Sequence, residues 1–197
     1  LQSAHVAVVG IGGVGTWAVE ALARSGVGAL TLIDLDDICV TNVNRQLHAL
    51  DGEIGRLKVD AMADRVRAIQ PSCEVTAVPD YLTEANAAAL LEAGFDVVID
   101  AIDSPRHKCA LLIAARDHGT PAVVVGGAGG RRDPTEVMTG DMTTSTNDAL
   151  LRVTRKRLRQ RCGWTRTGLW GVPCVWSRER AWYPTPDGGV CRQSRQE

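Results

Sequence analysis

The sequence lacks several features that mark other classes of protein. No apolar run approaches 18 residues, and residues 1–13 have no cationic start or cleavage pattern, so neither a transmembrane helix nor a signal peptide is expected. The six cysteines include no C-x-x-C pair, which argues against a disulfide framework and a structural zinc site. There is no internal repeat or low-complexity segment. These absences predict a cytoplasmic protein whose cysteines are mostly reduced and buried.

The charge balance is close to neutral, but the charges are unevenly placed. The 197 residues are 45% hydrophobic and 23% charged, which is typical of one folded, water-soluble domain. The net charge is −1, yet residues 1–130 carry 9 Lys and Arg against 16 Asp and Glu, whereas residues 131–197 carry 13 against 7. A basic segment behind an acidic body indicates either a surface for a polyanion or a solvated helix face.

Short apolar runs alternate with helical stretches along residues 1–130. Strands are predicted at His5–Val9, Leu30–Ile33, Glu74–Val78, Asp96–Ile99 and Pro121–Val125, and helices from the glycine turn to Arg24 and at Arg56–Gln70, Thr83–Glu92 and Ser104–His118. The alternation predicts an α/β fold: a Rossmann-like, doubly wound, mostly parallel sheet that binds a nucleotide. Residues 131–197 are expected to form a small basic C-terminal extension of the same domain, with a strand near Glu136–Thr139 and a helix at Asp148–Gln160.

Glycines follow the first predicted strand at Gly10, Gly12, Gly13 and Gly15. The pattern G-x-G-x-x-G between a strand and a helix lets backbone amides approach a phosphate without a Cβ in the way. Asp34 ends the second strand 19 residues after Gly15, where a carboxylate can accept hydrogen bonds from ribose hydroxyls. A nucleotide site is favoured over a purely structural turn, and these residues alone fit NAD as well as ATP.

Cationic side chains follow the second predicted strand at Arg45 and Lys58. In isolation, either would be interpreted as a solvated surface cation. Near a nucleotide, Arg and Lys stabilise the charge that develops when a phosphoanhydride breaks, which favours ATP over NAD. Asp103 lies at the carboxyl edge of the sheet, where its carboxylate either holds magnesium or caps the next helix. Asp100 is expected to be buried and structural.

Five segments resemble the ubiquitin-activating-type adenylyltransferase superfamily, which includes the adenylyltransferases of molybdopterin and thiamine biosynthesis. They are Gly10–Gly15, Leu32–Asp36, Thr41–Gln46, Gly55–Lys58 and Asp100–Asp103. The resemblance implies that ATP converts a carboxylate into an acyl-adenylate, with Asp34 at the ribose, Asn42, Arg45 and Lys58 at the phosphates, and Asp103 at magnesium. The full set expected to bind the nucleotide is Gly10, Gly12, Gly13, Gly15, Asp34, Asp36, Asn42, Arg45, Gln46 and Lys58; Arg45, Lys58 and Asp103 are the expected catalytic residues.

Four segments are similar to one branch of this superfamily, the tRNA threonylcarbamoyladenosine dehydratases. They are Ser3–Gly10, Asn44–Leu50, Gly126–Pro134 and Tyr183–Cys191, and the similarity covers nearly the whole chain. It implies a homodimer that cyclises threonylcarbamoyladenosine in tRNA, using ATP and magnesium, with a monovalent cation and a sulfur-transfer partner protein as further components. The carbonyls of the Gly126–Gly130 loop are a candidate site for that cation.

Three other functions stay open. The first is activation of the C-terminus of a ubiquitin-like sulfur-carrier protein, although such relatives often carry the paired C-x-x-C zinc ligands that this chain lacks. The second is an NAD-dependent oxidoreductase, for which only 67 residues remain after Gly130. The third is a tRNA-binding scaffold that binds ATP without turnover.

Several residues allow both a functional and a structural interpretation. The basic helix and the loop Arg161–Trp170 are candidates for contact with tRNA phosphates, with Trp164 or Trp170 as a stacking face. Packing in the core or a dimer interface explains Trp164, Trp170, Trp176 and Trp182 at least as well. Cys174 is either a nucleophile or a buried small hydrophobic residue. No role is assigned to His48. The resemblance also implies further segments before Leu1 and after Glu197, so the chain alone is expected to lack full activity.

Overall fold

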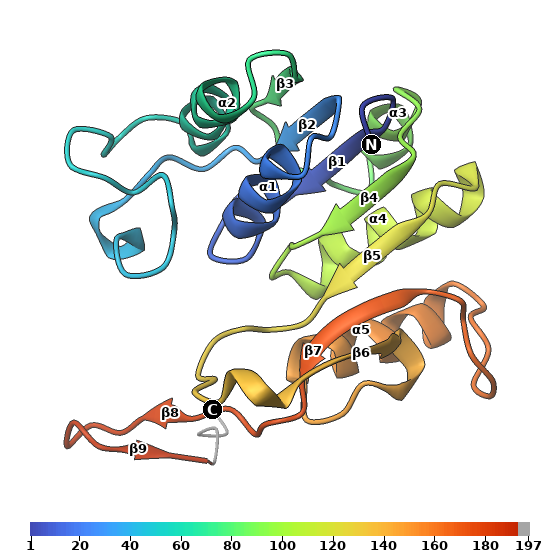
Figure 1. Cartoon of the computed structure of the whole chain (residues 1–197). Coiled ribbons are helices and arrows are strands. Elements are labelled where there is room, and N and C mark those ends of the chain that lie inside the picture. Colours follow the sequence, from blue (N-terminus) through green and yellow to red (C-terminus); the bar gives the residue numbers. More distant parts are fainter. Residues whose placement is uncertain (193–197) are drawn as a thin grey trace. The chain divides into compact units, whose positions relative to one another are not determined.

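The structure is a computed structural model that describes residues 1–192 (Figure 1). Its contacts divide the chain into two compact units, Leu1–Val123 and a second unit that begins at Val124. The last residues of the expected C-terminal extension, 193–197, lie outside the described residues.

The first unit alternates strands with helices, as the sequence predicted. Its elements are β1 (His5–Val9), α1 (Gly15–Arg24), β2 (Ala29–Ile33), the short 3-10 helix η1 (Val40–Asn42), α2 (Lys58–Ile69), β3 (Glu74–Val78), α3 (Ala87–Leu91), β4 (Val97–Asp100) and α4 (Pro105–His118). The four strands are parallel and hydrogen-bond in the order β3-β2-β1-β4. Because β1 is central and parallel to its neighbours, the loop after β1 lies at the same sheet edge as the loops after β2 and β4.

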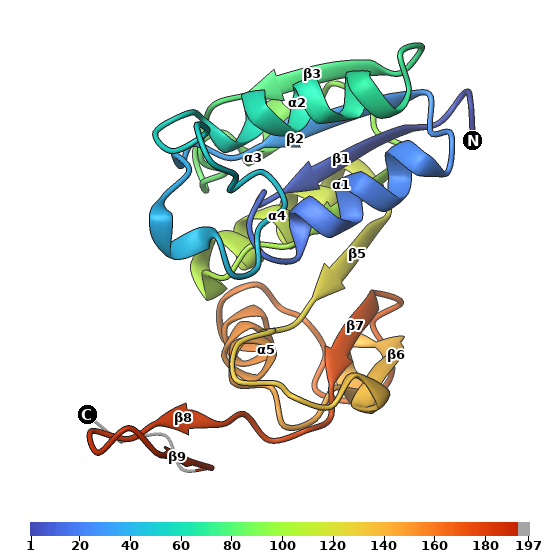
Figure 2. The same ribbon diagram turned by 60° about the vertical axis from the view of Figure 1, so that its left-hand side comes forward.

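Successive residues of β1 point to opposite faces of the sheet, and helices cover both faces (Figures 1 and 2). Val8 belongs to a core with Val19 of α1 and Met62 of α2. Ala7 belongs to a second core with Leu91 of α3 and Leu111 of α4. Burial of each large apolar side chain stabilises the fold by about 1.5–3 kcal/mol. The predicted doubly wound arrangement is therefore confirmed.

The fifth strand, β5 (Ala122–Val125), contains the boundary between the units. Before the boundary, the Val98 amide donates to the Pro121 carbonyl at 2.9 Å. After it, Val124 pairs in parallel with Cys174 of β7. The strand order is β3-β2-β1-β4-β5-β7-β6 in a mostly parallel sheet of seven strands, where β6 runs antiparallel to β7.

The second unit holds a helix and shorter strands. Its elements are η2 (Pro134–Glu136), β6 (Val137–Asp141), η3 (Met142–Thr144), α5 (Ala149–Arg161), β7 (Pro173–Ser177), β8 (Tyr183–Pro184) and β9 (Val190–Cys191). The Asp148 side chain caps α5 by accepting from the Leu151 amide at 2.8 Å. Leu151, Thr154 and Leu158 are fully buried along one side of α5, whereas Arg152, Lys156 and Arg161 are exposed.

Some helices begin later than predicted because local contacts hold the residues before them. The helix expected at Thr83–Glu92 is only α3, since the Asn86 side chain accepts from the Thr83 amide at 2.7 Å and forms a turn there instead. The helix expected from Arg56 begins at Lys58 because Leu57 is extended. Ser104, not Asp103, occupies the N-cap position of α4, so the interpretation of Asp103 as a helix cap is wrong.

The prediction for the cysteines is only partly right. No disulfide joins the six cysteines of the described chain. Cys73 and Cys174 are buried, but Cys39 is exposed, and Cys109, Cys162 and Cys191 are of intermediate exposure. The expectation that most are buried is therefore wrong.

Within residues 1–192, no helix combines the length and apolar character needed to cross a membrane.

Candidate functional site

The glycines of the turn after β1 serve two different purposes. Gly10 has a φ of +91°, and a Cβ there would lie 2.8 Å from the Ala101 carbonyl oxygen. A Cβ at Gly15 would lie 1.8 Å from the Gly10 carbonyl oxygen. These two glycines are required by the turn itself. At Gly12, by contrast, the nearest atom to a Cβ is the Gln46 Nε2 at 3.9 Å, so packing alone does not require a glycine there.

The backbone amides at this turn are left without partners. No hydrogen bond within the described chain is formed by the amides of Gly12, Gly13 or Val14. No side chain caps α1, and its first turn carries no acidic residue. The N-terminus of a helix carries a partial positive charge, so these three amides have the arrangement that can bind an anion.

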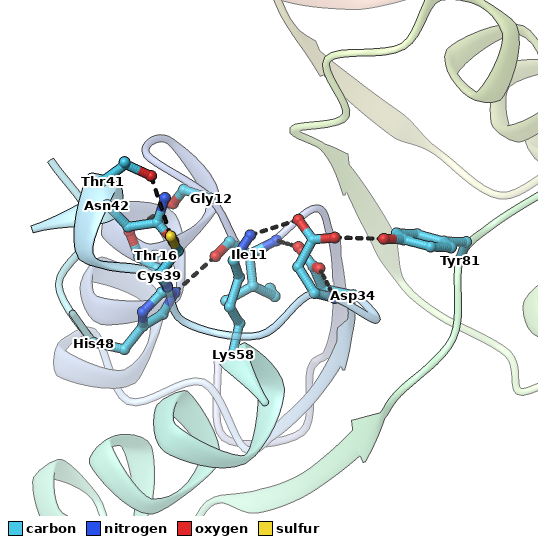
Figure 3. A network of polar contacts seen from close by, with 11 residues as sticks. Ile11, Gly12, Thr16, Asp34, Cys39, Thr41, Asn42, His48, Lys58 and Tyr81 are labelled. Atoms are coloured by element: carbon cyan, nitrogen blue, oxygen red, sulfur yellow. Dashed lines mark hydrogen bonds and ion pairs between the residues drawn. The ribbon is translucent and has the colours of Figure 1, made fainter. Parts of the chain in front are cut away.

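Side chains hydrogen-bond to both the amide and the carbonyl of Ile11 (Figure 3). The Ile11 amide donates to the Asp34 Oδ2 at 2.6 Å, and the Ile11 carbonyl lies 2.9 Å from the His48 Nε2. Burial lowers the pKa of His48, so its ring is neutral at pH 7 and Nε2 donates to the carbonyl. Sequence reasoning assigned no role to His48; the structure makes it a support of the turn.

Asp34 is largely occupied by the protein's own backbone. Besides the Ile11 amide, it accepts from the Asp36 amide at 2.8 Å, and its exposed fraction is 9%. Burial raises the pKa of Asp34 above its usual range, and the two amide hydrogen bonds oppose this only in part. A carboxylate has about four lone-pair positions, so it can still accept from a ligand hydroxyl.

Asp36 connects Lys58 to an unpredicted residue, Tyr81. The Lys58 Nζ lies 2.6 Å from the Asp36 Oδ2, and the Tyr81 hydroxyl donates to the Asp36 Oδ1 (Figure 3). Burial alone raises the pKa of Asp36, but the hydrogen bonds from Lys58 and Tyr81 and the Lys58 charge outweigh it, so the pKa lies below its usual range. The hydrogen bond to Asp36 raises the pKa of Tyr81 to about 12. Tyr81 follows β3, a predicted strand after which no site residue was expected.

Arg45 lies directly against the glycine turn. A Cβ at Gly13 would lie 3.3 Å from both Cγ and Cδ of Arg45, so the stem of Arg45 packs where a side chain is missing. Its Nη1 donates to the Thr41 carbonyl at 2.9 Å and the Asn44 Oδ1 at 2.8 Å. The Trp17 indole donates to the Arg45 carbonyl at 3.2 Å. These contacts fix the residue without neutralising its charge.

The amide side chains of this segment differ in availability. The Asn42 Oδ1 accepts from the Cys39 amide at 3.0 Å and so closes the turn of η1. Gln46 is buried beside Gly12, and its Oε1 has no hydrogen-bond partner among the described residues. The Gln46 Oε1 is therefore buried and without a described partner, whereas the Asn42 Oδ1 is already used.

Asp100 and Asp103, at the end of β4, have opposite environments. Asp100 is fully buried, with its Oδ1 2.9 Å from the Nζ of the equally buried Lys108, as expected for a structural residue. Asp103 is exposed and forms no hydrogen bond or ion pair with another described residue. It follows the Ala101 carbonyl that touches Gly10, so its carboxylate belongs to the sheet edge that carries the glycine turn.

The structure therefore brings together most of the expected residues. Asp34, Arg45 and Gln46 contact or adjoin the glycine turn, Lys58 and Asp36 follow from the end of β2, and Asp103 follows β4. Among residues 1–192, no group of three His, Cys, Asp or Glu side chains is placed to hold a metal ion.

Comparison with known proteins identifies relatives of this site. Residues 1–172 match the ThiF family. The tRNA threonylcarbamoyladenosine dehydratase of Escherichia coli is 50% identical over 190 residues, covering 95% of this chain and 71% of the relative. The enzyme of that name from Haemophilus influenzae is 48% identical over 160 residues, covering 81% and 61%. This chain thus spans only part of the relatives' length.

The solved structure of the Escherichia coli dehydratase in complex with ATP has a TM-score of 0.90 to this chain at 49% identity, covering 93% of this chain and 76% of that one. By contrast, the molybdopterin-synthase adenylyltransferase of Escherichia coli is 38% identical over only 53% of this chain. Fold, motifs and extent of similarity agree: the chain belongs to the ThiF family and, within it, to the tRNA threonylcarbamoyladenosine dehydratases.

Proposed function

We propose that the protein to which this chain belongs cyclises threonylcarbamoyladenosine in tRNA at the expense of ATP. The observation that carries the proposal is the glycine turn, where the unpaired amides of Gly12, Gly13 and Val14 adjoin the Arg45 side chain. Unpaired amides at a helix N-terminus and an adjacent guanidinium are groups that bind phosphate. The ATP complex of the Escherichia coli relative supports the same assignment.

The reaction needs activation because a carboxylate expels its oxygen poorly. In the proposed first step, a threonyl carboxylate oxygen bonds to the α-phosphorus of ATP and pyrophosphate leaves. In the second step, a nitrogen of the same side chain attacks the acyl carbon, loses its proton, and AMP leaves. Holding both groups in one side chain gives effective molarities of about 10⁵ M or more, so no enzyme nucleophile is needed. The burial of Cys174, 1% exposed within β7, is consistent with this route.

The chain's own residues would supply electrostatic stabilisation. The amides of Gly12 and Gly13 bind phosphate oxygens, and Arg45 offsets the negative charge that develops as pyrophosphate departs. Lys58 has the same role, but it is paired with Asp36 at 2.6 Å, so the phosphates must compete with a carboxylate for this ammonium group. Asp34 holds the turn through Ile11 and accepts from the ribose. Gln46 and Asn42 would contact the nucleotide through their side-chain amides, Asn42 through its Nδ2 because its Oδ1 is already used.

Magnesium, when bound, would neutralise phosphate charge and align the leaving group. Asp103 fits this ion because its carboxylate is exposed and has no described partner. Magnesium usually keeps several waters and takes only one or two carboxylates, so a single Asp beside the phosphates suffices.

Cellular location, oligomeric state and protein partners also follow from the similarity to the dehydratases. We place the protein in the cytoplasm, where its tRNA substrate is found. We expect it to form a homodimer, which light scattering tests, and to bind a sulfur-transfer protein, which a pull-down tests.

The Gly126–Gly130 loop suits a monovalent cation poorly. The Gly127 and Gly130 carbonyls accept from Arg131 at 3.4 Å and Trp182 at 2.8 Å, and the Arg131 guanidinium repels cations.

Mass spectrometry of tRNA nucleosides tests the function directly. The full-length protein is incubated with ATP, magnesium and tRNA that contains threonylcarbamoyladenosine. The expected product is the cyclised nucleoside, lighter by one water, with one AMP released for each ring formed. Formation of the ring without ATP, or its absence with ATP, would overturn the proposal.

The alternative substrate is the C-terminus of a sulfur-carrier protein. The same adenylation chemistry serves both, so ATP binding does not separate them. The greater extent of similarity to the dehydratases favours tRNA. ATP consumption that depends on an added ubiquitin-like carrier, and not on modified tRNA, would establish the alternative.

A further inference from the structure

The basic helix α5 and the loop after it carry an unusual concentration of charge. Residues 149–172 contain six Arg and one Lys, and neither Asp nor Glu. Within residues 1–192, the side chains of Arg152, Lys156, Arg157, Arg161 and Arg166 form no ion pair or hydrogen bond with the protein. We call these five residues the α5 basic face.

The charges of the α5 basic face repel one another. Arg152 and Lys156 are separated by one helical turn, as are Arg157 and Arg161. Like charges at this spacing destabilise a helix, and exposed helices usually avoid this with Glu or Asp. The partial negative charge at the C-terminus of α5 favours cations only in the last turn, where Arg159 and Arg161 lie. Arg152 and Lys156 gain nothing from it.

The loop that follows α5 is fixed by aromatic contacts. The rings of Trp164 and Trp170 meet edge to face with centroids 4.6 Å apart, and the Arg159 guanidinium lies 5.2 Å from the Trp170 ring centre. The Trp170 amide also donates to the Asp141 Oδ2 at 3.1 Å. These tryptophans support the loop that carries Arg166, so packing, and not stacking on bases, explains them.

A polyanion is the partner that this surface fits. The apolar residues Leu151 and Leu158 are fully buried, so α5 presents charge without the apolar side chains that a membrane-binding helix inserts. Arg outnumbers Lys, and its planar guanidinium binds phosphate oxygens in pairs. We infer that the α5 basic face binds the sugar–phosphate backbone of RNA, and therefore of the tRNA substrate. This inference rests on the proposed function for the identity of the RNA.

Removal of charge tests the inference. The variant Arg152→Gln, Lys156→Gln, Arg161→Gln in the full-length protein is compared with Arg67→Gln, Arg106→Gln, Arg116→Gln, which removes the same charge from exposed, ion-paired residues of the first unit. Binding of fluorescent, unmodified tRNA without ATP is measured by anisotropy at several salt concentrations. The α5 variant is expected to bind about 10- to 100-fold more weakly, with a salt slope lower by about two or more, while the control changes less than about twofold.

Further measurements distinguish loss of the RNA contact from damage to the helix and from failure of the proposed reaction. Replacement of Arg152 and Arg161 by Lys, which keeps the charge, is expected to recover most of the affinity; equal loss in this variant would point to damage to the helix and would overturn the inference. Unchanged tRNA binding by the Gln variant overturns it, as does a loss of binding only to phosphatidylserine vesicles. If cyclisation fails but the α5 variant still loses tRNA affinity, the surface stands and the proposed reaction does not.

Discussion

The two units differ in how many of their Lys and Arg side chains form ion pairs. In the first unit, eight of the nine Lys and Arg residues form an ion pair with a described carboxylate; they are Arg24, Arg56, Lys58, Arg65, Arg67, Arg106, Lys108 and Arg116. The exception is Arg45. In the described part of the second unit, only Arg131 and Arg178 form such pairs.

The contrast helps to separate structural cations from functional ones. A paired cation has its charge balanced inside the protein, whereas an unpaired cation has charge available for a ligand. Arg45 is the unpaired cation of an acidic unit, and it lies on the glycine turn. The α5 basic face is a set of unpaired cations within a basic unit. Each feature fits a phosphate ligand, one a nucleotide and the other a polynucleotide.

The buried pair of the first unit should give the largest effect on stability. Lys108→Met leaves the Asp100 carboxylate buried with its partner removed, and we expect a loss of about 3–5 kcal/mol of unfolding free energy. Arg116→Ala is the matched control on the same helix, because its pair with Asp117 is exposed and is worth at most about 1 kcal/mol. Urea unfolding measures both. Equal losses would show that burial does not separate the two pairs.

Arg45 should give the largest effect on activity. We expect Arg45→Ala to lower kcat for cyclisation by about 10²–10³-fold, since it removes a cation that stabilises the leaving pyrophosphate, with little change in thermal stability. Arg67→Ala removes an ion-paired cation of the same unit and should change kcat less than twofold. If both variants retain full activity, the absence of an ion pair at Arg45 has no functional meaning.

Two single substitutions separate the structural role of Gly15 from the proposed binding role of Gly12. Gly15→Ala places a methyl group against the Gly10 carbonyl and should cost about 1–3 kcal/mol of stability or more. Gly12→Ala meets no atom closer than 3.9 Å and should leave stability within about 0.5 kcal/mol, while ATP affinity falls. Thermal unfolding and ATP titration follow the two effects. Normal ATP binding by Gly12→Ala would show that the phosphates of ATP do not lie against Gly12.

His48 should give the smallest effect, and only below neutral pH. Burial lowers its pKa in the folded state below the ordinary value of 6.5, so the unfolded chain binds the proton more readily. The contribution of the neutral ring is therefore complete above pH 6.5 and decreases as the pH falls toward the folded-state pKa. Thermal unfolding between pH 5 and 8 should show a shallower pH dependence for His48→Gln. An identical pH dependence in both proteins would contradict this role.

Periodic and local features of the fold were predictable from the sequence. The alternation of apolar runs and helices predicted the order of the first unit because the central strands β1 and β2 are buried on both faces. The strand β7 was not predicted, since Pro173 begins it and its partner β5 is distant in sequence. The late start of α3 depends on one Asn86 side chain, which no periodic pattern reports.

The candidate site was predictable where it follows contiguous motifs. Gly12, Arg45 and Asp103 were expected and adjoin the same turn or sheet edge. The sequence could not show that Lys58 is held by Asp36 or that His48 supports Ile11, because each contact joins segments that only the fold brings together. Tyr81 was missed for the same reason: it reaches Asp36 across 45 positions of sequence.

Exchange of labelled pyrophosphate into ATP, catalysed by the full-length protein, tests the central claim most directly. If the turn holds the triphosphate while the threonyl carboxylate attacks, the label enters ATP only when tRNA carrying threonylcarbamoyladenosine is present, and Arg45→Ala abolishes the exchange. Cyclised nucleoside formed without any exchange, under conditions where pyrophosphate can rebind, would contradict the acyl-adenylate.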